Sequence, residues 1–194
     1  IKFDIQLYLD WLRRKVAEAE RDNNLTVLMN TTATSEWVLA QQPDSVVVAV
    51  GSNPVTLPIP GQNTNRTMLA TDLLVHPEEL AGVQRVIVVG GGDVGCEVAY
   101  WLRMEHAKEV TVIEMEPRFM GHTVTSNRGM LIHYLGRAGV PLLNCTKAVE
   151  ITPRGLRVER NLHPSVPNPY ETWHPILPAN IAVSYTHLTL PTTP

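Results

Sequence analysis

Residues 85–95 read RVIVVGGGDVG, and this stretch decides the fold. The apolar run over residues 86–89 is typical of a strand buried on both faces of a parallel sheet. From Asp93 to Ala107, apolar side chains recur every three or four positions, which predicts an amphipathic helix. Residues 110–113, VTVI, predict the next strand. Strand, helix and strand in this order predict parallel pairing through a right-handed crossover, and therefore an α/β fold with a Rossmann-like parallel sheet.

The turn between the first strand and the helix carries the pattern G-x-G-x-x-G. Its six positions are Gly90, Gly91, Gly92, Asp93, Val94 and Gly95. After a buried strand and at the start of a helix, this pattern predicts dinucleotide binding. We expect Gly90 to permit the tight turn, Gly92 to let the backbone approach a pyrophosphate, and Gly95 to let helix and strand pack closely. The helix N-terminus supplies N–H groups and partial positive charge to the phosphates.

An acidic residue, Glu114, ends the second strand 19 residues after Gly95. At this position a carboxylate accepts hydrogen bonds from the adenosine ribose hydroxyls and repels a 2′-phosphate, which favours NAD(H) over NADP(H). The simpler alternative is a glycine turn without a ligand and a solvated Glu114. Glu97 lies in the first turns of the helix, where the dipole favours an acid without any ligand.

Other segments also show the periodicity of regular structure. Residues 3–20 predict an amphipathic helix packed on a sheet, and residues 71–74 and 126–138 predict two further helices, with Gly139 as a left-handed cap. Residues 25–29 and 45–50 predict strands, the second buried on both faces. Proline and glycine predict an irregular linker over residues 52–66. Alternation on either side of Pro153-Arg154-Gly155 predicts an antiparallel hairpin.

Composition excludes several classes of function. A net charge of −3 gives no footprint for nucleic acid, and the sequence has no apolar run long enough to span a bilayer, so neither nucleic acid nor membrane is an expected partner. Two cysteines, Cys96 and Cys145, cannot build a zinc or iron–sulfur site, and the histidines show no metal-ligand spacing. We expect a reducing, cytoplasmic setting, small-molecule cofactors and no metal. No residue is assigned as catalytic, because hydride transfer places the chemistry on the cofactors.

Three stretches of the chain carry a resemblance to known flavoproteins. Residues 43–54, 59–61 and 86–97 resemble the junction between the FAD and NAD domains of two-dinucleotide-binding flavoproteins. Residues 90–97, 109–115 and 127–129 resemble the C-terminal module of NADH:flavin oxidoreductases of the old yellow enzyme group, which includes 2,4-dienoyl-CoA reductase, 2-enoate reductase and trimethylamine dehydrogenase.

This resemblance implies a partial FAD-binding domain and linker over residues 1–82, followed by an incomplete NAD-binding domain over residues 83–180. It implies that electrons pass from NADH through FAD to an unsaturated, enoate-type substrate, with FMN and a 4Fe-4S cluster in an N-terminal barrel outside this chain. It also implies a site role for Gly51, which matches the family's Ala-Thr-Gly strand end with Val50 in place of threonine. Glu97 matches an acid that lies near the nicotinamide end of the cofactor in related disulfide reductases, which implies a cofactor-binding role for it. The trimethylamine dehydrogenase branch implies an alternative, a structural module that binds ADP without hydride transfer.

The end of the chain has a different composition. Residues 164–194 contain seven of the fifteen prolines and predict loops throughout. Residues 183–194 resemble the translation of a sequencing-library adaptor, so we expect this segment to be an artefact, dispensable and disordered. We also expect the chain to be a fragment, poorly folded and inactive by itself, because strands that close its sheets would be absent and parallel edges would lie exposed.

Overall fold

The computed structural model describes residues 3–56, 58–62, 67–123, 125–161, 172–173, 176–184 and 188–189. The chain divides into two compact units, Ile1–Ala49 and Val50–Pro194. The second unit begins at Val50, so the boundary between the two compact units lies before residue 83, where the NAD-binding domain was expected to begin. The assignment of residues 1–82 to an FAD-binding domain remains a prediction.

The first unit contains two helices, α1 (Phe3–Arg21) and α2 (Ser35–Ala40). The helix expected over residues 3–20 is confirmed, but it is not buried against a sheet, since Trp11 remains 44% exposed. The hydroxyl of Thr34 caps α2 by accepting a hydrogen bond from the N–H of Trp37 at 3.2 Å.

The strands expected over residues 25–29 and 45–50 are wrong, because the structure has no regular backbone pairing there. Val47 and Val48, which were expected to be buried on both faces, are 88% and 77% exposed. A strand exists only where a neighbouring strand completes its hydrogen bonds, and among the described residues none pairs with these segments. β-propensity without a partner therefore leaves an extended, exposed chain.

The second unit is built on a five-stranded parallel sheet in the order β2-β10-β3-β4-β5. The strands are β2 (Thr67–Leu69), β3 (Arg85–Val89), β4 (Glu109–Ile113), β5 (Leu142–Leu143) and β10 (Ile181–Ser184). The connections are α3 (Ala70–Val75), the short helix η1 (Pro77–Leu80), α4 (Asp93–Met104) and α5 (Thr125–Arg137). The expected parallel α/β sheet is confirmed, with β3 paired to β4 from Arg85↔Glu109 to Val89↔Ile113.

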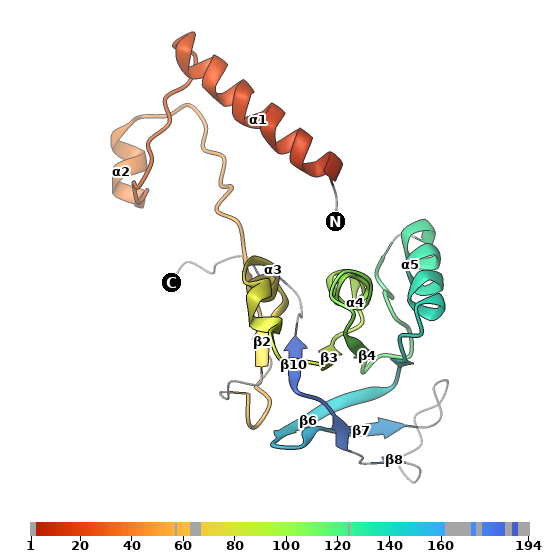
Figure 1. Cartoon of the computed structure of the whole chain (residues 1–194). Coiled ribbons are helices and arrows are strands. Elements are labelled where there is room, and N and C mark those ends of the chain that lie inside the picture. Colours follow the sequence, from red (N-terminus) through yellow and green to blue (C-terminus); the bar gives the residue numbers. More distant parts are fainter. Residues whose placement is uncertain are drawn as a thin grey trace. The chain divides into compact units, whose positions relative to one another are not determined.

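A smaller antiparallel layer contains β6 (Thr146–Thr152), β7 (Gly155–Asn161), β8 (Thr172–Trp173) and β9 (Ile176–Pro178). Two further short strands, β1 (Asn53–Pro54) and β11 (Leu188–Thr189), pair with each other. The expected hairpin is therefore confirmed as β6 and β7, whereas the linker expected to be irregular contains β1. Figure 1 shows α3, α4 and α5 on one side of the parallel sheet and the antiparallel strands on the other.

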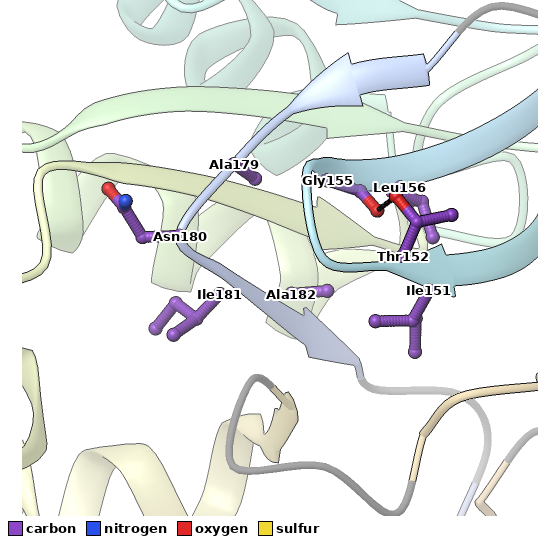
Figure 2. Close-up of a pocket in the computed structure, with 8 residues that line it drawn as sticks. All are labelled: Ile151, Thr152, Gly155, Leu156, Ala179, Asn180, Ile181 and Ala182. Carbon is purple, nitrogen blue, oxygen red and sulfur yellow. Dashed lines mark hydrogen bonds between the residues drawn. The ribbon is translucent and has the colours of Figure 1, made fainter.

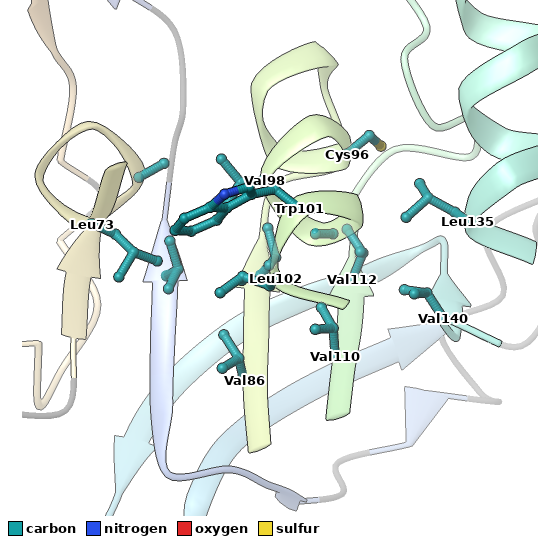
Figure 3. Packing of buried hydrophobic residues seen from close by; sticks show 14 of the residues in the cluster. Leu73, Val86, Cys96, Val98, Trp101, Leu102, Val110, Val112, Leu135 and Val140 are labelled. Carbon is teal, nitrogen blue, oxygen red and sulfur yellow. The ribbon is translucent and has the colours of Figure 1, made fainter. Parts of the chain in front are cut away.

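Alternate residues of β3 enter two separate hydrophobic cores. Val86 and Val88 pack with α4 and α5, as Figure 3 shows around Trp101, Leu102 and Leu135. Ile87 and Val89 pack on the opposite face with Leu156 and Val158 of β7. Burial on both faces explains the unbroken apolar run of this strand.

The expectation that residues 164–194 form only loops is wrong for β9 and β10. Val183 of β10 is fully buried, and its neighbours in the sheet are Val88 of β3 and Met68 of β2. β10 lies between β2 and β3, so the proline-rich end of the chain contributes a strand to this sheet. The expectation that closing strands are missing remains a prediction. Val183 and Ser184 are thus ordered parts of the sheet, although the proposed adaptor origin of residues 183–194 remains a prediction.

Candidate functional site

The glycine loop begins where β3 ends, at the carboxyl edge of the parallel sheet. From β3 the chain passes through α4 to β4 on one side, and it returns later to β10 on the other side. Ligands of open α/β sheets bind at such a reversal of strand order, outside the carboxyl ends of the strands. Gly90 has a φ of +106°, and its N–H donates to the carbonyl of Ile113 at 3.0 Å. The expected tight glycine turn is confirmed by this backbone conformation.

Gly95 brings α4 against the loop. A Cβ at this position would lie 1.9 Å from the carbonyl oxygen of Gly90, a distance that no side chain tolerates. The atom in the way belongs to the backbone and cannot rotate aside. The packing role expected for Gly95 therefore has a direct geometric basis.

Gly92 differs from Gly95, because a Cβ here would have no heavy atom within 4 Å. Gly92 is the N-cap of α4, and no side chain caps this end of the helix. The first N–H groups of a helix lack acceptors within the helix. Open space next to uncapped N–H donors fits a pyrophosphate, and the protein itself has no steric need for glycine here.

Glu114 follows β4 and lies next to the glycine loop. Its Oε2 accepts a hydrogen bond from the N–H of Gly91 at 2.7 Å, and its Oε1 accepts one from the N–H of Glu116 at 2.8 Å. The side chain is half-buried. Each carboxylate oxygen has a further lone pair, so the group has capacity left to accept from a ribose diol.

The other predicted residues differ in their positions. Asp93 is exposed and accepts a hydrogen bond from the hydroxyl of Thr123, and Val94 packs at the edge of the core. Glu97 is half-buried on α4, one turn beyond Asp93. Gly51 is not brought into the loop: it lies in exposed chain between α2 and β1, with a φ of +74° and no heavy atom within 4 Å of a Cβ. The cofactor-binding role expected for Gly51 remains a prediction.

Neither cysteine has the environment of a redox thiol. Burial raises the pKa of Cys96 to about 12, and the nearby carboxylates of Asp93 and Glu114 add to this effect. Burial also raises the pKa of Cys145. A thiol that stays protonated is a poor nucleophile, in agreement with the expected packing role.

Other classes of site find no support in the described part of the chain. No group of three or more metal-ligating side chains gathers there. None of its helices combines the length and the apolar character that crossing a membrane needs.

A crevice lies between the β6–β7 hairpin and the amino end of β10, and Figure 2 shows its lining. Its two polar side chains are already bonded: Thr152 donates to the carbonyl of Gly155 at 2.8 Å, and Oδ1 of Asn180 accepts from the N–H groups of Gln84 and Arg85. The crevice lines the amino edge of the sheet, opposite the glycine loop. The crevice therefore has the features of a gap between packed elements and not those of a ligand site.

Two features of this region escaped sequence reasoning. The first is β10. Its apolar run, Ile181–Val183, is short and lies in a proline-rich part of the sequence, which favours a loop. The second is the segment Phe119–Thr123, which contacts the glycine loop and has no periodic pattern of its own. The buried Phe119 was the one available signal, because a large aromatic side chain in an irregular segment often fills a core position.

Comparison with known proteins agrees with this geometry. Residues 5–166 match the sequence profile of a family described as pyridine nucleotide-disulphide oxidoreductase. The chain is 32% identical over 157 residues to the NADH oxidase of Thermoanaerobacter brockii, an alignment that covers 80% of this chain and 23% of that protein. It is 35% identical over 115 residues to the cinnamate reductase of Clostridium sporogenes, with 58% of this chain and 16% of that protein covered.

A solved complex of 2-naphthoyl-CoA reductase with 2-naphthoyl-CoA shares the fold, with a TM-score of 0.67 and 19% identity. The match covers 89% of this chain and 24% of that one. This chain thus spans a quarter or less of the length of each of these three proteins.

Proposed function

Because this chain belongs to the pyridine nucleotide-disulphide oxidoreductase family, a family of oxidoreductases that bind FAD and NAD(H), we propose that its glycine loop binds NADH. In the whole flavoprotein this NADH would reduce FAD. The pyrophosphate would be held at the N-terminus of α4 beside Gly92, and Glu114 would accept hydrogen bonds from the adenosine ribose. NADH supplies a hydride when bound; the residues described here bind and orient the ADP half of the cofactor.

The proposal rests on two neighbouring features of the loop: the carboxylate of Glu114 and the open space beside Gly92. The carboxylate is held toward the loop by the N–H of Gly91 at 2.7 Å, while the adjacent residue leaves space and helix donors for an anion. One site thus combines a negative group suited to hydroxyl donors with a positive helix end suited to phosphates. A 2′-phosphate would meet the Glu114 carboxylate, and the site therefore prefers NADH to NADPH.

For the whole protein, we propose an unsaturated substrate of the enoate or enoyl type. The support is the resemblance of residues 90–97 and 109–115 to the old yellow enzyme group, together with the name of one relative, a cinnamate reductase. Cinnamate is a carboxylate conjugated to a carbon–carbon double bond. On this proposal, the FMN and 4Fe-4S cluster of that group would belong to parts of the protein outside this chain.

A second candidate is a structural module that binds ADP and transfers no hydride. It agrees equally well with the contacts derived above, because Gly92 and Glu114 both address groups that ADP shares with NADH. The two candidates differ in whether the nicotinamide half contributes.

Calorimetric titration of the chain with NADH, NADPH and ADP tests the proposal. We expect NADH and ADP to bind and NADPH to bind at least tenfold more weakly. No binding of either NADH or ADP would overturn both candidates. In the flavoprotein that contains this chain, stoichiometric reduction of bound flavin by NADH supports hydride transfer, whereas ADP binding without flavin reduction supports the structural module.

A further inference from the structure

Both polar groups of the Gly91 backbone are engaged by the protein, in three hydrogen bonds. The N–H donates to Oε2 of Glu114 at 2.7 Å, and the carbonyl accepts from the N–H of Met120 at 2.7 Å and from the thiol of Cys96 at 3.5 Å. Gly92, the next residue, has no heavy atom within 4 Å of a Cβ. Neighbouring glycines of one loop therefore have different partners: the protein surrounds Gly91, and Gly92 faces open space.

The side of Gly91 where a side chain would project is filled by Phe119. A Cβ on Gly91 would lie 2.2 Å from Cδ1 and 2.6 Å from Cε1 of the Phe119 ring, and 3.0 Å from Cβ of Glu114. The ring is 9% exposed and belongs to the helix-side core. Phe119 thus lies against the loop at the place where the loop meets the side chain of Glu114.

The segment Phe119–Thr123 is fixed on both sides of this contact. Nε of Arg128, on α5, donates to the carbonyl of Phe119 at 2.8 Å. The hydroxyl of Thr123 donates to the carboxylate of Asp93, the first residue of α4. With the bond from Met120 to Gly91, the segment links α5, the glycine loop and the start of α4.

We propose that Phe119 is a positioning residue of the nucleotide site. Its ring sets the spacing between the glycine loop and the Glu114 carboxylate, which address the pyrophosphate and the ribose of a single ADP group. A rigid ligand of fixed length binds well only if both contacts are in place at once, so a displaced loop weakens binding even where the fold survives. This inference rests on the proposed function of the site.

The test is a double-mutant cycle on the full chain, with NADH affinity and melting temperature measured for each variant. Gly91→Ala, whose backbone is outside the left-handed region, is expected to raise the Kd for NADH at least tenfold because the methyl group meets the ring. Phe119→Ala is expected to raise it by a similar factor through loss of spacing. In the Phe119→Ala background, Gly91→Ala is expected to have less than a twofold further effect, because the obstructing ring is gone.

The matched control is Leu80→Ala, which removes a 3% exposed side chain from the same core, on η1. We expect it to lower the melting temperature and leave the Kd of the folded protein unchanged. Phe119→Leu serves if Phe119→Ala does not fold; it should retain the fold and still weaken NADH binding. Unchanged affinity in Phe119→Leu, or fully additive effects in the cycle, would overturn the positioning role. Absence of NADH binding by the unmodified chain would instead reject the proposed function.

Discussion

Oε2 of Glu114 accepts a hydrogen bond from the N–H of Gly91 at 2.7 Å, so the acid that ends β4 is tied to the loop that ends β3. The two residues lie on neighbouring parallel strands, and their meeting point is the carboxyl edge of the sheet. The carboxylate therefore has two functions, as a tether of the loop and as the proposed ribose acceptor. A substitution of Glu114 changes both, and a useful variant separates them.

Glu114→Gln retains one carbonyl oxygen as an acceptor and removes the negative charge, whereas Glu114→Ser removes the charge and leaves only a short hydroxyl. Either change should weaken NADH binding and admit NADPH, since a hydrogen bond to a charged group contributes about 1.5 to 3 kcal/mol and the preference should fall by roughly 10- to 150-fold. Glu116→Ser is the matched control, because that side chain is exposed and only its backbone N–H contacts Glu114. Kd values for both nucleotides measure the ratio. An unchanged ratio in Glu114→Ser would leave Glu114 as a tether only.

Gly92→Val and Gly95→Ala should fail for different reasons. Valine at residue 92 has open space and a φ of −74°, so the protein should fold with a melting temperature within a few degrees of the original. The side chain then occupies the place of the pyrophosphate, and NADH and NADPH should both be lost. Alanine at residue 95 meets the Gly90 carbonyl at 1.9 Å and should destabilise the fold itself. Circular dichroism melts and nucleotide titrations distinguish the two, and normal NADH binding by Gly92→Val would contradict the proposed pyrophosphate position.

The βαβ unit could be predicted from sequence because its local and long-range requirements coincide. The run over residues 86–89 is buried on both faces, and Gly90 and Gly95 are required by backbone geometry within the same turn. The segments at residues 25–29 and 45–50 failed because β-propensity specifies a strand only when another strand is available. β10 was missed for the opposite reason: its neighbours β2 and β3 impose a strand on a short run between prolines.

The candidate site was predicted only where its residues carry a motif. Gly90, Gly92 and Glu114 are found by spacing, because a dinucleotide fixes the distances among them. Phe119 lies against Gly91 but belongs to a segment without periodicity. No known sequence pattern relates an aromatic side chain after β4 to the glycine loop before α4. Side-chain packing of this kind depends on the assembled core.

Truncation tests the position of β10. A chain that ends at Ala182 lacks the fully buried Val183 and two residues of the strand between β2 and β3, whereas a chain that ends at Ser184 retains them. Burial of one valine contributes about 1.5 to 3 kcal/mol, so the shorter chain should melt at least about 3 °C lower. Calorimetry of the two truncated chains measures the difference. Equal melting temperatures would indicate that Val183 and Ser184 are dispensable for the fold.

Cys96 should make the stability of the fold decrease at alkaline pH. Burial, followed by the carboxylates of Asp93 and Glu114, raises the pKa of the folded thiol to about 12 from an ordinary value of 9.0. Between these values the unfolded chain loses a proton that the folded chain retains, so the unfolded state is favoured as the pH rises. The free energy of unfolding should fall by about 1.4 kcal/mol per pH unit above about pH 9, and the contribution is fully present below that pH.

Cys96→Ala removes this thiol and leaves Cys145 and all other titrating groups in place. Urea unfolding from pH 7 to 11 should therefore show a constant difference between the two proteins up to about pH 9 and a change in favour of Cys96→Ala above it. A difference that stays constant to pH 11 would mean that the Cys96 thiol ionises in the folded protein as easily as in the unfolded chain.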